Sequence, residues 1–392
     1  MRILFNTGLF LLLSYLVANA ALSSVEGERS AVQLVAGLGI LAMLAYCFVC
    51  GLKRFRITRY WPFSRVWFVF VAVMILYYAL ALVDLPSGYA SKSPRSLFVG
   101  IYIIVTACFV YYGVVNRHLT DRKLVLMTAG LFGGALVELY LTVTNPITQL
   151  GMEVINTGSG YVFAMLLPLL MYRYRNQSLW VFIVLLGLTA LTGKRGALVI
   201  FCLLALFYAL NLKTIGHAFK FNYKTGIAAA LAVLTFSNFM EIGYESLVFR
   251  IETMVHPERG SVGSGRDVIW ITLLGHWWHS GVPQFFFGSG YYSALAIEGH
   301  VAHNDYIEFL VGYGVMGIFI FLVFQYRLYR DIRSVRNLDK YLYCMLFMCL
   351  IVFVGRSVFA GTIRTDQIYW SVSIGYLLGI ATLKGLDNGF KN

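Results

Sequence analysis

The residues best suited to chemistry in this chain form a short block, His303-Asn304-Asp305-Tyr306, directly before an apolar run from Ile307 to Phe324. Histidine is the side chain whose ordinary pKa lies closest to physiological pH, and it is the most frequent general acid or base. The apolar run is long enough to cross a bilayer. A titratable side chain at the mouth of a membrane helix marks a candidate functional site. The block therefore predicts a proton-accepting group at one end of a membrane span.

Two acidic residues, Asp305 and Glu308, occupy the first turn of the helix predicted after His303. The positive end of the helix dipole favours acids at such positions. We expect them to orient the imidazole and to raise its basicity, with Asn304 as a further supporting residue. The alternative is that His303 only caps the helix or lies at the membrane interface.

Cationic side chains gather in segments that we assign to the same side of the membrane as His303. A guanidinium binds phosphate through two parallel hydrogen bonds, and a rigid glycine-bounded turn such as Thr192-Gly193-Lys194-Arg195-Gly196 fixes its direction. The candidate phosphate ligands are Lys194, Arg195, Arg266, Arg356 and Arg364. The alternative is that they bind lipid headgroups or pair with nearby acids, namely Glu138, Glu252, Asp267 and Asp366.

Histidine spacing leaves a metal site open as an alternative. His276 with His279, and His300 with His303, are each three residues apart, a spacing that zinc ligands can have. No acidic residue completes a familiar ligand pattern, so we predict neither a metal nor a cofactor. The six cysteines all fall in apolar runs, where a thiol behaves as a small hydrophobic group.

The composition predicts the elements that must position these residues. The chain is 59% hydrophobic and only 12% charged, which is typical of an integral membrane protein. Apolar runs recur along its whole length, and we interpret them as about twelve transmembrane helices. They cover residues 3–22, 31–52, 66–84, 97–115, 124–143, 161–172, 179–192, 197–212, 225–240, 305–325, 341–360 and 368–384. We therefore predict an all-α protein with a single polytopic membrane domain, residues 1–392.

The net charge of +13 follows this topology. Most lysines and arginines lie in the connections that share a side with the amino terminus, and the positive-inside rule places that side in the cytoplasm. Both termini are then cytoplasmic, residues 241–304 form a large outer loop between the ninth and tenth spans, and nucleic acid is not an expected partner. Ala18-Asn19-Ala20 is similar to a signal-peptide cleavage site, but we expect the first run to stay as an uncleaved span.

Within the outer loop, the residues after Arg266 predict an amphipathic helix that carries Trp270, Trp277 and Trp278. Tryptophan is enriched where a membrane meets water. We expect this helix to lie in the interface and to cover an outer cavity.

Three motifs taken in order resemble the superfamily of O-antigen ligases and Wzy-type polysaccharide polymerases. Gly193-Lys194-Arg195-Gly196 looks like the arginine–glycine turn of that family, and Ser264-Gly265-Arg266 with Asp267-Val268-Ile269-Trp270 is similar to its loop arginine. His303-Asn304-Asp305-Tyr306, followed by Gly312, Gly314 and Gly317, is close to its histidine block. The glycines have an alternative role, since they let helices approach closely.

The resemblance implies a GT-C-like fold in the bacterial inner membrane and metal-independent, inverting glycosyl transfer on the periplasmic face. It implies that Arg195 and Arg266 hold the diphosphate of an undecaprenyl-diphosphate-linked glycan and that His303 is the general base. The chain has no nucleotide-binding motif, so its substrate must arrive activated. The implied partners are that glycan, a glycan acceptor, membrane lipids and a chain-length regulator.

Three functions follow from these observations. A polymerase is expected first, because Arg356 and Arg364 would serve a second diphosphate. The alternatives are a ligase that transfers glycan to lipid A-core and, more distantly, a polysaccharide or lipid transporter, for which Glu138 is the main ionisable candidate.

Overall fold

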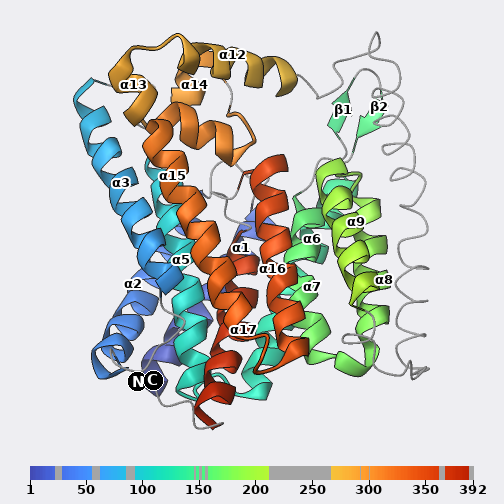
Figure 1. The fold of residues 1–392 in the computed structure, drawn as a ribbon. Coiled ribbons are helices and arrows are strands. Elements are labelled where there is room, and N and C mark those ends of the chain that lie inside the picture. The colour runs from blue at the N-terminus through green and yellow to red at the C-terminus, as the bar shows by residue number, and fades with distance from the viewer. Residues whose placement is uncertain are drawn as a thin grey trace.

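The structure is a computed structural model, and it describes residues 1–22, 29–54, 62–84, 93–144, 147–149, 152–154, 158–211, 266–291, 293–299, 301–361 and 367–387. Its described part is a bundle of helices (Figure 1). The bundle consists of α1 (Arg2–Leu22), α2 (Arg29–Arg54), α3 (Pro62–Asp84), α5 (Ser93–Val115), α6 (Asp121–Thr144), α7 (Ser159–Arg173), α8 (Ser178–Leu191), α9 (Arg195–Leu210), α15 (Asp305–Ser334), α16 (Lys340–Phe359) and α17 (Gln367–Asp387).

Smaller elements complete the described chain. They are the antiparallel strands β1 (Ile147–Gln149) and β2 (Met152–Val154), the 3-10 turn η2 (Arg175–Gln177), and the short helices α12 (Arg266–Trp278), α13 (Val282–Phe287) and α14 (Ser293–Glu298). The two strands and α12–α14 lie at one end of the bundle, which we call the outer end, whereas α1 begins and α17 finishes at the other (Figure 1). The strand pair was not expected from the sequence.

The prediction of an all-helical bundle is confirmed at every expected run that the structure describes; only 225–240 lies outside the described residues. Three described helices are long and apolar enough to cross a membrane, namely Asp121–Leu141, Asp305–Ser334 and Lys340–Phe359. Twelve spans remain a prediction. α15 continues well past residue 325, where the buried residues Phe324, Leu328 and Ile332 recur at helical spacing.

Close packing within the bundle depends on small residues. A side chain at Gly375 would overlap the backbone of Ala107, and one at Gly379 would press against Val114. These two glycines are four residues apart on α17, so they lie on one face and let the helix approach α5 closely. Apolar side chains from α1, α2, α5, α7, α15, α16 and α17 fill the core between the helices.

α15 is broken at Gly314, whose φ of 65° lies in the left-handed region. Glycine adopts this conformation without steric cost. Near the break, the N–H of Ser289 donates to the carbonyl of Val311 (2.8 Å), and the N–H of Gly290 donates to the carbonyl of Gly312 (3.0 Å). The turn between α13 and α14 therefore docks on the broken helix, and it fixes the outer segment to the bundle.

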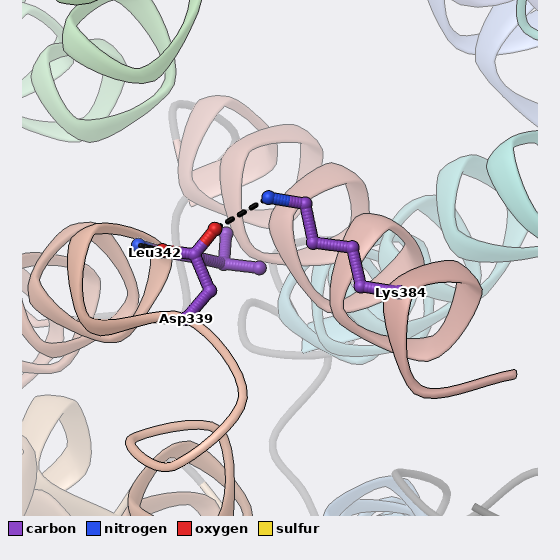
Figure 2. Close-up of polar contacts among 3 residues, drawn as sticks. All are labelled: Asp339, Leu342 and Lys384. Atoms are coloured by element: carbon purple, nitrogen blue, oxygen red, sulfur yellow. Dashed lines mark hydrogen bonds and ion pairs between the residues drawn. The ribbon is translucent and has the colours of Figure 1, made fainter. Parts of the chain in front are cut away.

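At the opposite end, Asp339 begins α16 by accepting a hydrogen bond from the N–H of Leu342 (3.0 Å) and pairs with Lys384 of α17 (Figure 2). Burial acts to raise the pKa of Asp339, but the bonds from Lys384 and Leu342 act in the other direction and hold it below its ordinary value. The carboxylate therefore joins two helices and stays charged at neutral pH.

Candidate active site at the outer end

α15 begins with a well-formed cap next to His303. The side-chain oxygen of Asn304 accepts hydrogen bonds from the N–H groups of Tyr306 (3.0 Å) and Ile307 (3.3 Å). An asparagine in this role satisfies two of the helix's otherwise unpaired donors. His303 thus stands directly before a helix start, as the sequence predicts.

His303 has a φ of 55°, a left-handed conformation that residues with a side chain rarely adopt. The preceding residue, Ala302, is held at both of its polar groups. Its N–H donates to Oε1 of Glu308 (2.6 Å), and its carbonyl accepts from Nε1 of Trp270 (2.7 Å). A strained backbone persists only where its surroundings enforce it. We infer that Glu308 and Trp270 together enforce the position of His303.

The contact with Trp270 belongs to a wider attachment of α12 to α15. Leu273 of α12 is fully buried in a small apolar cluster with Ala302, Ile307 and Val311. This cluster is separate from the main core, and it fixes α12 across the start of α15.

Arg195 is the first residue of α9 and follows a tight turn. Gly193 has a φ of 59°, and the N–H of Lys194 donates to Oγ1 of Thr192 (3.4 Å). A side chain at Gly196 would overlap the hydroxyl of Tyr161 and the Cβ of Phe359, so a larger residue there would force these neighbours to shift. The two glycines that the sequence singled out thus have separate steric roles.

Arg266 is the first residue of α12, and its Nη1 donates to the carbonyl oxygen of Phe359 (2.7 Å). Burial lowers the pKa of Arg195, and the positive charge of Arg266 lowers it further. Two like charges held near each other at a helix mouth are stabilised when an anion binds between them.

The end of α16 is the point at which these elements meet. Phe359 contacts both Gly196 of α9 and Arg266 of α12. Two residues later, Gly361 lies beside the carboxylate of Asp305, the first residue of α15. The starts of α9, α12 and α15 therefore converge on residues 359–361, although they are far apart in sequence.

Arg356 is placed differently from the expectation that it binds substrate phosphate. Its side chain is 1% exposed. Nε donates to the carbonyl of Gly361 (3.0 Å), and the guanidinium lies over the ring of Tyr161 (5.2 Å to the centroid). We infer that Arg356 shapes the turn at the end of α16 from inside the protein.

Helix amino termini add to the positive character of the outer end. α7, α9, α15 and α17 all begin there (Figure 1). Unpaired N–H groups and the helix dipole favour anions at such ends. At α7 the anion is a carboxylate of the protein itself, because Oε1 of Glu138 accepts a hydrogen bond from the N–H of Gly158 (3.1 Å). Glu138, the main ionisable candidate for a transporter, thus contacts the start of α7.

The remaining candidates are placed as follows. Lys194 is half-buried immediately before α9. Arg364 and His300 lie outside the described residues. His276 is exposed on α12 and His279 is exposed just after it, where its Nδ1 contacts the carbonyl of Gly275 (2.8 Å). Among the described residues, no group of three His, Cys, Asp or Glu side chains is arranged to hold a metal ion.

Sequence reasoning missed two residues that build this site. Trp270 was expected only as an interfacial tryptophan, and Phe359 was taken as part of an apolar run. Trp270 donates to the carbonyl of Ala302, and the carbonyl of Phe359 itself accepts from Arg266; the sequence carries no signal for either long-range bond. No protein-family model matches the chain, and no curated protein matches it. The resemblance described from the motifs therefore stays a hypothesis that rests on those motifs alone.

Proposed function

We propose that the protein is a membrane glycosyltransferase that takes glycan from a lipid diphosphate at its outer end. Three helix starts converge on residues 359–361. Two of them carry Arg195 and Arg266, and the third follows His303. This convergence is the observation that carries the proposal. A phosphate-binding pair beside a candidate base is the arrangement that glycosyl transfer from a diphosphate requires.

The reaction would be a single displacement. The acceptor hydroxyl oxygen attacks the anomeric carbon while His303 accepts its proton, and the bond from the anomeric carbon to the diphosphate oxygen breaks. The electron pair leaves with the diphosphate, whose growing charge Arg195 and Arg266 stabilise. The configuration at the anomeric carbon inverts. Neither a metal nor a cofactor has a role in this scheme.

The choice of acceptor separates a polymerase from a ligase. A polymerase binds a second lipid diphosphate, for which Arg356 and Arg364 are the candidate cations. The side chain of Arg356 is buried and bonded to Gly361, and its role at a second diphosphate stays a prediction. We keep polymerisation of undecaprenyl-diphosphate-linked repeat units as the proposal and transfer to lipid A-core as the alternative.

Transport of the same lipid-linked glycan is a weaker alternative. A transporter places ionisable residues near the middle of the bilayer. Glu138 instead contacts the N–H that precedes α7, at the outer end. The proposal of an enzyme accounts for the arginine pair and His303 together.

Conservative substitution tests the arginine pair. Purified protein in liposomes is given a lipid-diphosphate-linked glycan and an acceptor, and transfer is measured for Arg195→Lys and Arg266→Lys. We expect each to lose most of the activity, because an ammonium cannot reproduce a two-pronged guanidinium contact. Arg327→Lys, exposed near the far end of α15, is the matched control and should transfer normally. Near-normal transfer by both test variants would contradict the diphosphate clamp.

Deletion of the gene separates the two enzyme assignments. A polymerase predicts surface glycan of single repeat units on the usual acceptor. Long chains that accumulate on the lipid diphosphate, with bare core on the acceptor, would identify a ligase.

A further inference from the structure

α12 presents three different sides along its length. Ile269, Leu273 and Trp277 face the bundle, and Leu273 is fully buried. Thr272 and His276, four residues apart, are exposed polar residues on a second side, which also carries exposed Val268 one turn earlier. A third side is both apolar and exposed, and its members are spaced by three and four residues, as one face of a helix requires.

The exposed apolar side consists of Ile271, Leu274 and Trp278, and we call it the outer stripe. Ile271 is 72% exposed and Trp278 is 67% exposed. Asp267 lies at its amino end, in the first turn, where the helix dipole favours an acid. Side chains of this size gain about 1.5–3 kcal/mol each when they leave water completely. A stripe of three is therefore a strong candidate for contact with an apolar phase.

The outer stripe continues onto α13. Trp277 stacks on Phe285, with ring centroids 4.5 Å apart, and its Nε1 donates to the carbonyl of the same residue (3.2 Å). This contact holds α13 against the carboxyl end of α12. Val282, Phe286 and Phe287 of α13 are all exposed.

The stripe then continues from α13 onto a membrane-spanning candidate. The backbone of Phe286 lies directly against Gly314 of α15. Two residues further along α15, Met316 begins a row of exposed apolar side chains that includes Phe319. α15 is one of the described helices long and apolar enough to cross a membrane. Exposed apolar side chains thus occur on a candidate span, on α13 and on α12, and each of these elements contacts the next.

We propose that α12 and α13 are embedded in the outer leaflet of the membrane, with the outer stripe and Phe286 in contact with lipid. The three sides of α12 then meet three environments: the bundle, the lipid and the water. Figure 1 shows α12 lying across the end of the bundle, the orientation of a helix in a membrane interface. Exposed tryptophan suits this position because its ring is apolar and its N–H is polar.

This placement has a consequence for the site. Arg266 opens α12, and Trp270 on the same helix holds the residue before His303. A helix fixed at the depth of the lipid headgroups keeps both contacts at the depth where a lipid phosphate lies. The lipid contact itself does not depend on the proposed reaction.

Release from the membrane is no test, since the bundle anchors the chain, so the test measures local environment. Single cysteines replace Ile271, Leu274 or Trp278 in a Cys202→Ser background, because Cys202 is the exposed native thiol among the described residues. Each carries a nitroxide label in liposomes of phosphatidylethanolamine and phosphatidylglycerol. Collision with oxygen, which concentrates in lipid, is compared with collision with a water-soluble nickel chelate. Thr272 and His276 are the matched controls on the same helix.

We expect labels on the outer stripe to collide with oxygen several-fold more often than with the chelate, and labels on the two controls to show the reverse. Equal access of the chelate to labels on the outer stripe and on the two controls would overturn the proposal. A stripe that neither reagent reaches would also overturn it, because another protein surface would then cover the stripe. A second measurement needs no label. Brominated lipid should quench wild-type tryptophan fluorescence more strongly than that of Trp278→Phe, and equal quenching would contradict the lipid contact.

Discussion

Substitution of Trp270 by phenylalanine tests whether His303 depends on its enforced backbone. The change keeps an aromatic ring but removes the N–H that donates to the carbonyl of Ala302 at 2.7 Å. A lost hydrogen bond of this kind costs about 1–2 kcal/mol when the acceptor stays partly buried. The left-handed backbone conformation of His303 costs a similar free energy, about 1–2 kcal/mol, which the hydrogen bond must offset. A loss of this size shifts an equilibrium about fivefold to thirtyfold.

We therefore expect Trp270→Phe to lower kcat by about fivefold to thirtyfold while KM changes little, because the arginine pair is untouched. Trp277→Phe is the matched control: it removes an indole N–H from the same helix, but that N–H holds α13. It should lose similar thermal stability and keep kcat. Glu308→Gln should rescue most of what Glu308→Leu loses, since an amide oxygen still accepts from Ala302.

An assay that is independent of catalysis separates positioning from folding. Diethyl pyrocarbonate modifies exposed imidazoles, and mass spectrometry reports its rate at His303. We expect a rate in Trp270→Phe that differs from both wild type and Trp277→Phe. If the two tryptophan variants lose kcat equally, or if Trp270→Phe is as active as wild type, the reasoning is refuted.

A cysteine at Ser289 should react with an impermeant thiol reagent in intact cells and one at Ser334 should not; labelling of Ser334 alone would reverse the orientation. Gly314→Ala should lower the melting temperature strongly because of its left-handed φ and its contact with α13, whereas Gly187→Ala, which meets open space, should be neutral or stabilising. Asp339 has a lower pKa in the folded protein than in the unfolded chain. Its carboxylate therefore stabilises the fold at pH values above the unfolded-state pKa, and this stabilisation is lost as the pH falls through the folded-state pKa. Acid melting curves should show this dependence in wild type and lack it in Asp339→Asn; the difference at neutral pH should be below about 1 kcal/mol, since the pair is partly exposed.

The helices were predictable because long apolar runs permit few other structures. The start of α15 was also predictable, since Asn304 and the acids after it form a recognisable helix beginning. Its length was not, because the basic residues beyond residue 325 suit a connection as well as a helix. The break at Gly314 was hidden for a related reason: a glycine in an apolar run is as compatible with close helix packing as with a left-handed turn.

The site could be predicted in its residue types but not in its connections. Arg195, Arg266 and His303 were found from charge, glycine spacing and position. The starts of α9, α12 and α15 converge on residues 359–361 because of tertiary packing, which one sequence does not encode in any local pattern. Arg356 shows the limit of charge counting, since a buried guanidinium on Tyr161 has the same sequence signature as an exposed one. The role of Arg364 stays a prediction, because it lies outside the described residues.

The central claim is that His303 accepts a proton during glycan transfer, and one substitution tests it most directly. His303→Asn keeps a polar side chain that tolerates the left-handed backbone but cannot serve as a base. Purified wild type and variant are compared in liposomes with a lipid-diphosphate-linked glycan, an acceptor and a strong chelator. We predict transfer by the wild type and a loss of about a hundredfold or more in the variant, with unchanged thermal stability. Transfer by His303→Asn at the wild-type rate, or no transfer by the wild type from any lipid-diphosphate donor, would contradict the account.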